Sequence, residues 1–140
     1  MIAIDTNVLL RYLLEDDPAQ AARSAKLILG RQPVLVTDVV LVETVWTLRG
    51  KKYQLPHDEI AVVIQALFEE PNLRFENGAA VWMALSDYRD ARPVKGKIAD
   101  FPDALILNKA KALAAAGQQT FRGLYTFDTA AQALPGAKSP

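Results

Sequence analysis

The chain opens with Met1-Ile2-Ala3-Ile4-Asp5-Thr6-Asn7, and this stretch decides how the rest of the sequence is interpreted. Residues 2–4 are apolar without alternation, a pattern typical of a short strand that helices cover on both faces. A helical pattern of apolar residues follows at once. Asp5 therefore falls at the carboxyl end of the strand, where open α/β sheets bind their ligands.

The composition predicts one globular domain. The chain has 140 residues, of which 51% are hydrophobic, and its 16 Lys and Arg balance its 16 Asp and Glu. Because the net charge is zero, any contact with RNA or DNA must come from local basic clusters. The absence of cysteine excludes disulfides and thiolate metal sites. Without a signal peptide or an apolar run of roughly 18 residues, we expect a cytoplasmic protein that does not bind membranes.

Apolar periodicity and capping residues predict alternating strands and helices along the whole chain. Asp17 is expected to cap the second helix and Asp38 the third, and Asp128 is expected to cap a short helix that ends at Leu134. The expected strands are 2–4, 33–37, 73–75 and 124–126, and the expected helices are 6–14, 18–29, 39–49, 57–70, 78–88 and 102–116. This order predicts a single α/β domain over residues 1–134, with a short, mostly parallel sheet covered by helices on both faces. Residues 135–140 are expected to form a flexible tail.

Four acidic positions lie beside the predicted strand and helix boundaries: Asp5, Glu43, the pair Asp100 and Asp103, and Asp128. Asp5, Asp103 and Asp128 each have a simpler explanation, as helix caps or first-turn acids. Glu43 does not, because it lies inside an apolar helix with no Lys or Arg before Arg49. We expect Glu43 to be buried, so its carboxylate needs a metal ion, hydrogen-bond donors or a proton.

Helix caps explain each acid separately but not why the acids occur at related boundaries. Residues that follow parallel strands meet at one edge of the sheet, so we expect these carboxylates to converge. Converging carboxylates repel one another unless cations neutralise them. Oxygen ligands without Cys or His favour Mg²⁺ or Mn²⁺, ions that also bind substrate phosphates. The sequence therefore indicates metal-assisted phosphodiester hydrolysis.

In their order and spacing, these motifs resemble PIN-domain ribonucleases. The resemblance rests on Asp5-Thr6-Asn7, Glu43, the segment from Ala99 to Ile106, and Thr126-Phe127-Asp128. It spans Ile2 to Leu134. Asp16-Asp17-Pro18 and the chain length make the sequence most similar to the VapC-type toxins of bacterial toxin–antitoxin pairs.

The resemblance implies an α/β PIN-like fold and a metal-dependent endoribonuclease that uses Mg²⁺ or Mn²⁺. It implies RNA as substrate, a VapB-type antitoxin as partner, and a homodimer. The implied metal-binding acids are Asp5, Glu43, Asp103 and Asp100, and Asp128 is a further catalytic acid. Thr6, Asn7 and Thr126 would orient these carboxylates or a bound water.

Basic residues near the acidic motifs are candidate RNA contacts, although solvation alone also explains the polar loop at 89–97. The candidates are Arg11, Arg89, Arg92, Lys95 and Lys97. Two other functions stay open. One is a PIN-domain nuclease for RNA processing that is not a toxin, and the other is a non-enzymatic interaction module whose acids are only helix caps.

Overall fold

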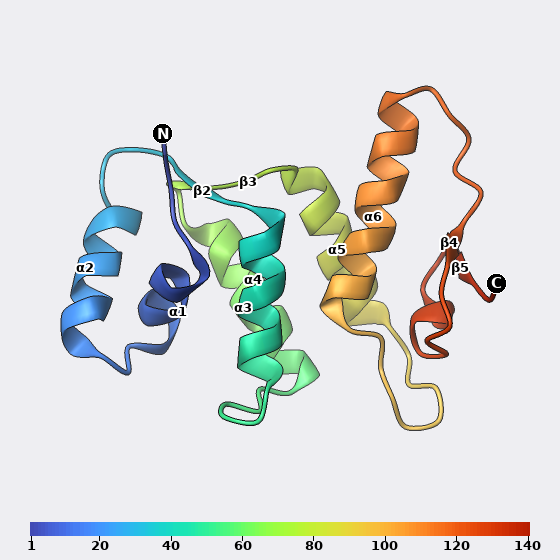
Figure 1. Ribbon diagram of the computed structural model, residues 1–140, viewed down its shortest axis with the longest axis horizontal. Coiled ribbons are helices and arrows are strands. Elements are labelled where there is room, and N and C mark those ends of the chain that lie inside the picture. Colours follow the sequence, from blue (N-terminus) through green and yellow to red (C-terminus); the bar gives the residue numbers. More distant parts are fainter. The chain divides into compact units, whose positions relative to one another are not determined.

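The computed structural model describes residues 1–140 and contains six α-helices and two small parallel sheets (Figure 1). The chain divides into two compact units, residues 1–76 and residues 77–140. None of the helices combines the length and the apolar composition that a membrane span requires.

The first unit is built on a three-stranded parallel sheet in the order β1-β2-β3. Its strands are β1 (Ile2–Ala3), β2 (Val34–Val36) and β3 (Leu73–Phe75), and its helices are α1 (Thr6–Leu14), α2 (Pro18–Ile28), α3 (Asp38–Arg49) and α4 (His57–Glu69). Ile2 pairs with Val34, which pairs in turn with Leu73. Because α1 follows β1 and α3 follows β2 almost directly, neighbouring strands place the starts of these two helices near each other.

Side-chain caps set where the helices of this unit begin. Asp5 caps α1, and Asp17 caps α2 by accepting a hydrogen bond of 3.1 Å from the Gln20 amide, as predicted. The prediction that Asp38 caps α3 is wrong. Thr37 is the cap, because its backbone is still extended and its hydroxyl accepts from the Val40 amide at 3.3 Å. Asp38 is instead the first helical residue.

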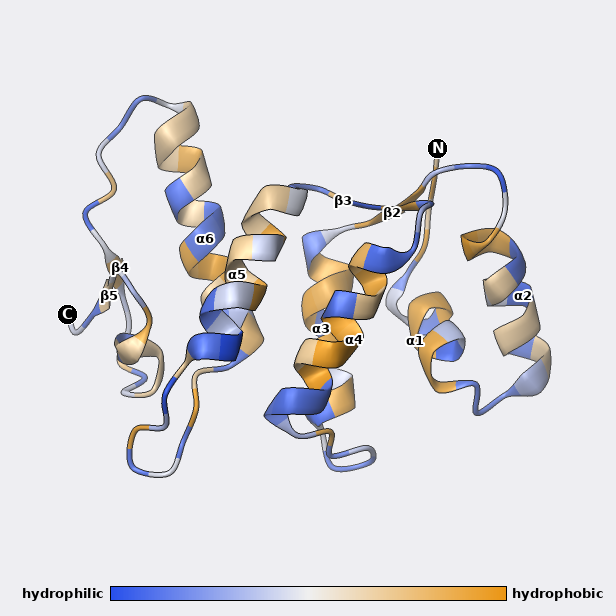
Figure 2. Ribbon diagram, turned by 180° about the vertical axis from the view of Figure 1, so that it is seen from behind, coloured by the Kyte–Doolittle hydropathy of each residue, from blue (hydrophilic) through white to orange (hydrophobic).

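The core of the first unit is aliphatic. Figure 2 shows that α3 and α4 are largely hydrophobic, whereas the turn that joins them is hydrophilic. The fully buried side chains come from every layer of the unit: Leu9, Ile28, Val34, Val36, Leu41, Leu48, Ile60, Ile64 and Leu67. Removing such apolar surface from water is the main favourable contribution to folding.

The second unit packs α5 (Gly78–Asp90) against α6 (Phe101–Ala116). The buried rings of Tyr88 and Phe101 meet edge to face, with centroids 5.9 Å apart. Buried Asn108 donates a hydrogen bond of 2.8 Å to Asp87 and another of 2.9 Å to the Ala104 carbonyl. These contacts fix how the two helices pack.

The fourth strand is placed differently from the prediction. β4 (Leu124–Tyr125) belongs to a separate two-stranded parallel sheet, in which it pairs with β5 (Ala137–Lys138) inside the expected tail. Backbone groups make this pairing, for example the bond of 2.9 Å from the Leu124 amide to the Gly136 carbonyl. No apolar pattern is needed for such pairing, so the sequence did not reveal β5. The flexibility of the tail and the boundary at residue 134 stay predictions.

A hydrogen bond ties α1 to the end of α4. The Tyr12 hydroxyl donates to Glu70 at 2.7 Å. Burial raises the pKa of Tyr12 from 10.0 to about 12, and the hydrogen bond to Glu70 and the charges of Glu70 and Glu15 act in the same direction. The folded protein therefore favours the protonated phenol.

This shift predicts a loss of stability at alkaline pH. The stabilisation from the Tyr12 shift is fully present below pH 10 and is lost as the pH rises toward 12. The difference in unfolding free energy between the wild type and Tyr12→Phe, measured in urea, should therefore shrink over this range. A difference that is constant with pH would contradict the assignment.

Candidate acidic site

Asp5 and Glu43 are brought toward each other by the residue that follows Asp5. The Asp5 carboxylate caps α1, with Oδ1 accepting a hydrogen bond of 2.9 Å from the Val8 amide. The Thr6 hydroxyl donates to Glu43 Oε2 at 2.8 Å. Glu43, which lies midway along α3, is thereby held beside the first turn of α1.

Each of these two carboxylates keeps one oxygen available. Asp5 Oδ2 and Glu43 Oε1 make no hydrogen bond, and neither residue forms an ion pair with Lys or Arg. Both residues are exposed. Two neighbouring anions without a cation repel each other, and a bound cation would remove that repulsion.

The prediction that Glu43 is buried is wrong. α3 buries the stripe formed by Leu41, Thr44, Val45 and Leu48, and Glu43 lies between these positions on the exposed side. The cost of a buried charge therefore gives no reason to assign a function to Glu43. The hydrogen bond from Thr6 is the reason to assign a function to Glu43, because it fixes an unneutralised carboxylate next to Asp5.

The acids of the second unit lie at helix starts. Asp100 caps α6 and accepts a hydrogen bond of 2.8 Å from the Phe101 amide, and half-buried Asp103 lies in the first turn of α6. Asp128 accepts bonds of 2.9 and 3.2 Å from the amides of Ala130 and Ala131. These bonds hold the turn that precedes the 3₁₀ helix Ala131–Ala133. The N-cap of that helix is Ala130, so the prediction that Asp128 caps a short helix through Leu134 is wrong.

The other polar residues of the motifs are placed as follows. Thr126 accepts a hydrogen bond of 3.1 Å from the Asp128 amide, and its carbonyl accepts one of 2.7 Å from the Gln132 side chain. Exposed Asn7 lines a cleft beside Asp5. Their roles in orienting carboxylates or water stay predictions.

No group of three or more Asp, Glu or His side chains is placed to hold a metal ion. Convergence of Asp5 and Glu43 with Asp100, Asp103 and Asp128 therefore stays a prediction. The pair Asp5 and Glu43 nevertheless suits a hard cation. Mg²⁺ is often bound through one or two carboxylates while it retains several waters, and the available oxygens of this pair provide such ligands.

The basic segment after α5 is more ordered than the irregular loop expected from the sequence. Val94 and Lys97 form an antiparallel bridge, and Lys95 and Gly96 both have positive φ, 51° and 78°. Two successive residues of this kind form a tight hairpin turn. The side chains of Arg92, Lys95 and Lys97 are exposed.

One cleft adjoins Asp5 within the first unit. It has a volume of about 290 Å³, lies between α1 and α2, and is lined by Asp5, Arg11, Arg23 and Ser24 among others. Arg23 and Ser24 were missed from the sequence, because only the packing of α2 against α1 brings them to Asp5. Their one sequence signal was a polar pair inside a helix of otherwise mostly small residues.

These features define an α/β protein with an acidic site made of oxygen ligands. The PIN domain profile matches residues 2–136, so the chain belongs to the PIN domain family. The predicted fold class, a single α/β PIN-like domain with six helices and a small parallel sheet, is confirmed. Comparisons with curated proteins and with solved structures gave no match.

Membership of the family sets the general activity. PIN domains are generally nucleases, a class of hydrolase, and they act on RNA. They typically use divalent metal ions. The acidic site described above is therefore the candidate active site.

The Thr6 hydrogen bond should matter for metal binding. Thr6→Val removes the donor that orients Glu43, and losing such a partner typically lowers metal affinity by about 10- to 100-fold. Thr47→Val is the matched control, because the Thr47 hydroxyl bonds to the backbone carbonyl of Glu43 instead, at 2.9 Å. Calorimetric titration with Mn²⁺ should show weaker binding for Thr6→Val only. Equal affinities for the two variants would rule out this role for Thr6.

Proposed function

We propose that this chain is a metal-dependent endoribonuclease and the toxin of a VapBC-type toxin–antitoxin pair. The observation that supports the proposal most is the hydrogen bond from Thr6 to Glu43, which holds an unneutralised carboxylate beside Asp5 in a member of a nuclease family. Asp5, Glu43, Asp103 and Asp100 would hold Mg²⁺ or Mn²⁺, and Asp128 would assist as a further acid.

The chain's own residues would supply fixed ligands and substrate contacts. When bound, the ion lowers the pKa of a coordinated water and neutralises charge on the scissile phosphate. The Val8 amide fixes one oxygen of Asp5, and Thr6 fixes one oxygen of Glu43. Both carboxylates thus keep a defined orientation. Arg11 and the basic segment from Arg89 to Lys97 would bind RNA phosphates.

The toxin role rests on sequence resemblance. Asp5-Thr6-Asn7 followed by Asp16-Asp17-Pro18, together with the segment from Ala99 to Ile106, is similar to VapC-type toxins. A VapB-type antitoxin and a homodimer are proposed on the same basis, as is a cytoplasmic location. A PIN-domain nuclease for RNA processing, without a toxin role, is the second candidate.

A purely structural role for the acids fits the molecule less well. Asp5 and Asp100 do cap helices, and Asp128 bonds to the backbone of the turn that follows it. Glu43 caps nothing, because it lies in the middle of α3 and its carboxylate is bound by Thr6. An interaction module would gain nothing from setting this second anion next to Asp5.

RNA cleavage by Asp5→Asn tests the proposal most simply. The amide oxygen of Asn still caps α1, but the charge needed to hold a divalent cation is gone. We expect metal-dependent cleavage of a mixed RNA panel by the wild type, abolition by chelator, and a loss of roughly 100-fold or more in Asp5→Asn. A loss of this size corresponds to about 2.7 kcal/mol of transition-state stabilisation.

Asp17→Asn is the matched control for this substitution. Asp17 caps α2 as Asp5 caps α1, with a bond to the amide three residues on. It should cleave RNA like the wild type. Undiminished cleavage by Asp5→Asn, or an equal loss in both variants, would refute the metal-binding role of Asp5.

The same variants separate the toxin from the RNA-processing nuclease. Induced production of the wild type in a bacterial host should arrest growth, and production of Asp5→Asn should not. If a short DNA-binding protein is encoded beside this gene, its co-production should relieve the arrest. Cleavage of RNA in vitro without growth arrest would favour the RNA-processing nuclease.

A further inference from the structure

We infer that the cleft between α1 and α2 binds the ribose-phosphate of an RNA nucleotide next to the cleaved bond. The inference rests on the proposed nuclease function and adds a substrate subsite to it. The cleft begins at Asp5 and is lined by Val8, Arg11, Arg23, Ser24 and Leu27. A strand held at Asp5 would therefore continue into it.

The basic residues that line the cleft favour binding of an anion. Arg11 on α1 and Arg23 on α2 both line it. Arg11 pairs with Asp16 at 2.8 Å, but Arg23 has no ion pair. Asp5 is the only acidic residue that lines the cleft, so the two guanidinium groups leave it with a net positive charge. A phosphate between them would be bound by charge-assisted hydrogen bonds.

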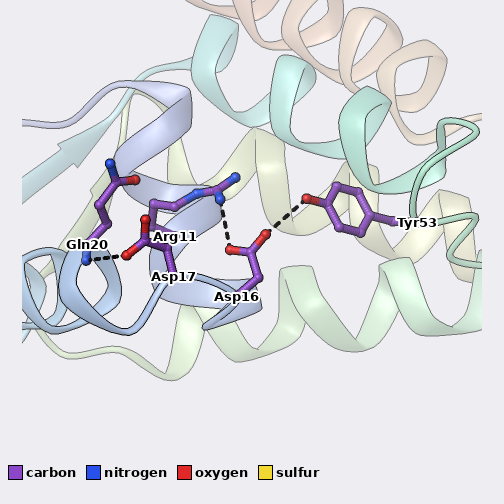
Figure 3. Close-up of polar contacts among 5 residues, drawn as sticks. All are labelled: Arg11, Asp16, Asp17, Gln20 and Tyr53. Carbon is purple, nitrogen blue, oxygen red and sulfur yellow. Dashed lines mark hydrogen bonds and ion pairs between the residues drawn. The ribbon is translucent and has the colours of Figure 1, made fainter.

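Asp16 fixes the position of Arg11. Figure 3 shows Asp16 between Arg11 and Tyr53, with one carboxylate oxygen accepting from the Arg11 guanidinium and the other from the Tyr53 hydroxyl at 3.3 Å. The Arg11 side chain is only 22% exposed. Because one of its five N–H groups makes this bond, the guanidinium is oriented and still has donors for a ligand.

Ser24 supplies a second, independent observation. Its residue surface is only 5% exposed, yet it lines the cleft and its hydroxyl has no hydrogen-bond partner in the protein. The Ser24 hydroxyl is not among the fully enclosed side-chain atoms that lack a hydrogen bond, so it faces the solvent of the cleft. A ligand hydroxyl or phosphate oxygen can therefore bond to it in place of solvent, and a ribose-phosphate carries both groups.

The size and the apolar walls of the cleft fit a single nucleotide. Its volume of about 290 Å³ is at the lower end of ligand pockets, which span roughly 300–1,000 Å³. Leu27, which is 44% exposed, and Val8 present apolar surface that the carbon face of a ribose would cover.

A simpler alternative treats the bond between Arg11 and Asp16 as a link from α1 to the following turn. That alternative explains Arg11 but neither Arg23 nor Ser24. The two interpretations differ in what happens to RNA binding when Arg23 alone is changed.

The test measures RNA binding separately from cleavage. Binding of a fluorescent single-stranded RNA octamer is followed by anisotropy in chelator, which prevents turnover, over a series of salt concentrations. The variants are Arg23→Ala, Arg23→Lys and Arg11→Ala, with Arg31→Ala, an exposed arginine outside the cleft, as the matched control. Melting curves confirm that each variant is folded.

Arg23→Ala and Arg11→Ala should each raise Kd by roughly tenfold, as expected for one lost charge-assisted hydrogen bond. Each should also lower the slope of log affinity against log salt by about 0.7, the value for one phosphate contact on a single strand. Arg23→Lys should retain most of the slope, and Arg31→Ala should match the wild type.

Equal affinities and slopes for Arg23→Ala and the wild type would overturn the inference, as would absence of RNA binding by the wild type. The proposed nuclease function is judged by the cleavage assay with Asp5→Asn. The binding assay can therefore rule out the subsite without ruling out the nuclease function. Failure of cleavage with normal, Arg23-dependent binding would contradict the nuclease function alone.

Discussion

The hydrogen bond between Thr6 and Glu43 is the interaction on which the proposed site depends. It joins residues 37 positions apart, so it requires the tertiary packing of α1 against α3. That packing follows from the pairing of β1 with β2, because each strand leads almost directly into its helix. Two neighbouring parallel strands thereby bring Glu43, midway along α3, toward Asp5 at the start of α1, without a cation to neutralise either carboxylate.

Local signals in the sequence predicted the first unit well. Asp5 and Asp17 were recognisable as caps because each precedes an apolar helical pattern, and capping depends on residues only three apart. The order of the acidic motifs also indicated the correct family. The features missed depend on geometry that periodicity does not encode. Glu43 is exposed because the opposite side of α3 faces the core. β5 is formed by backbone pairing alone.

The residues that line the cleft beside Asp5 also depend on tertiary packing. Arg11 was recognised from its proximity in sequence to Asp5, whereas Arg23 and Ser24 become neighbours of Asp5 only when α2 packs against α1. The ion pair with Asp16 shows how a basic side chain can be oriented in advance. A group that is fixed before binding loses less conformational entropy when the ligand arrives.

Binding of a divalent cation by Asp5 and Glu43 can be tested directly by anomalous diffraction from crystals soaked in Mn²⁺. We expect an anomalous peak within coordinating distance of Asp5 Oδ2 and Glu43 Oε1, the two oxygens that make no hydrogen bond in the protein. The same peak should be absent from crystals of Asp5→Asn. Manganese bound elsewhere, with no peak at these two oxygens, would show that Asp5 and Glu43 do not form the cation site.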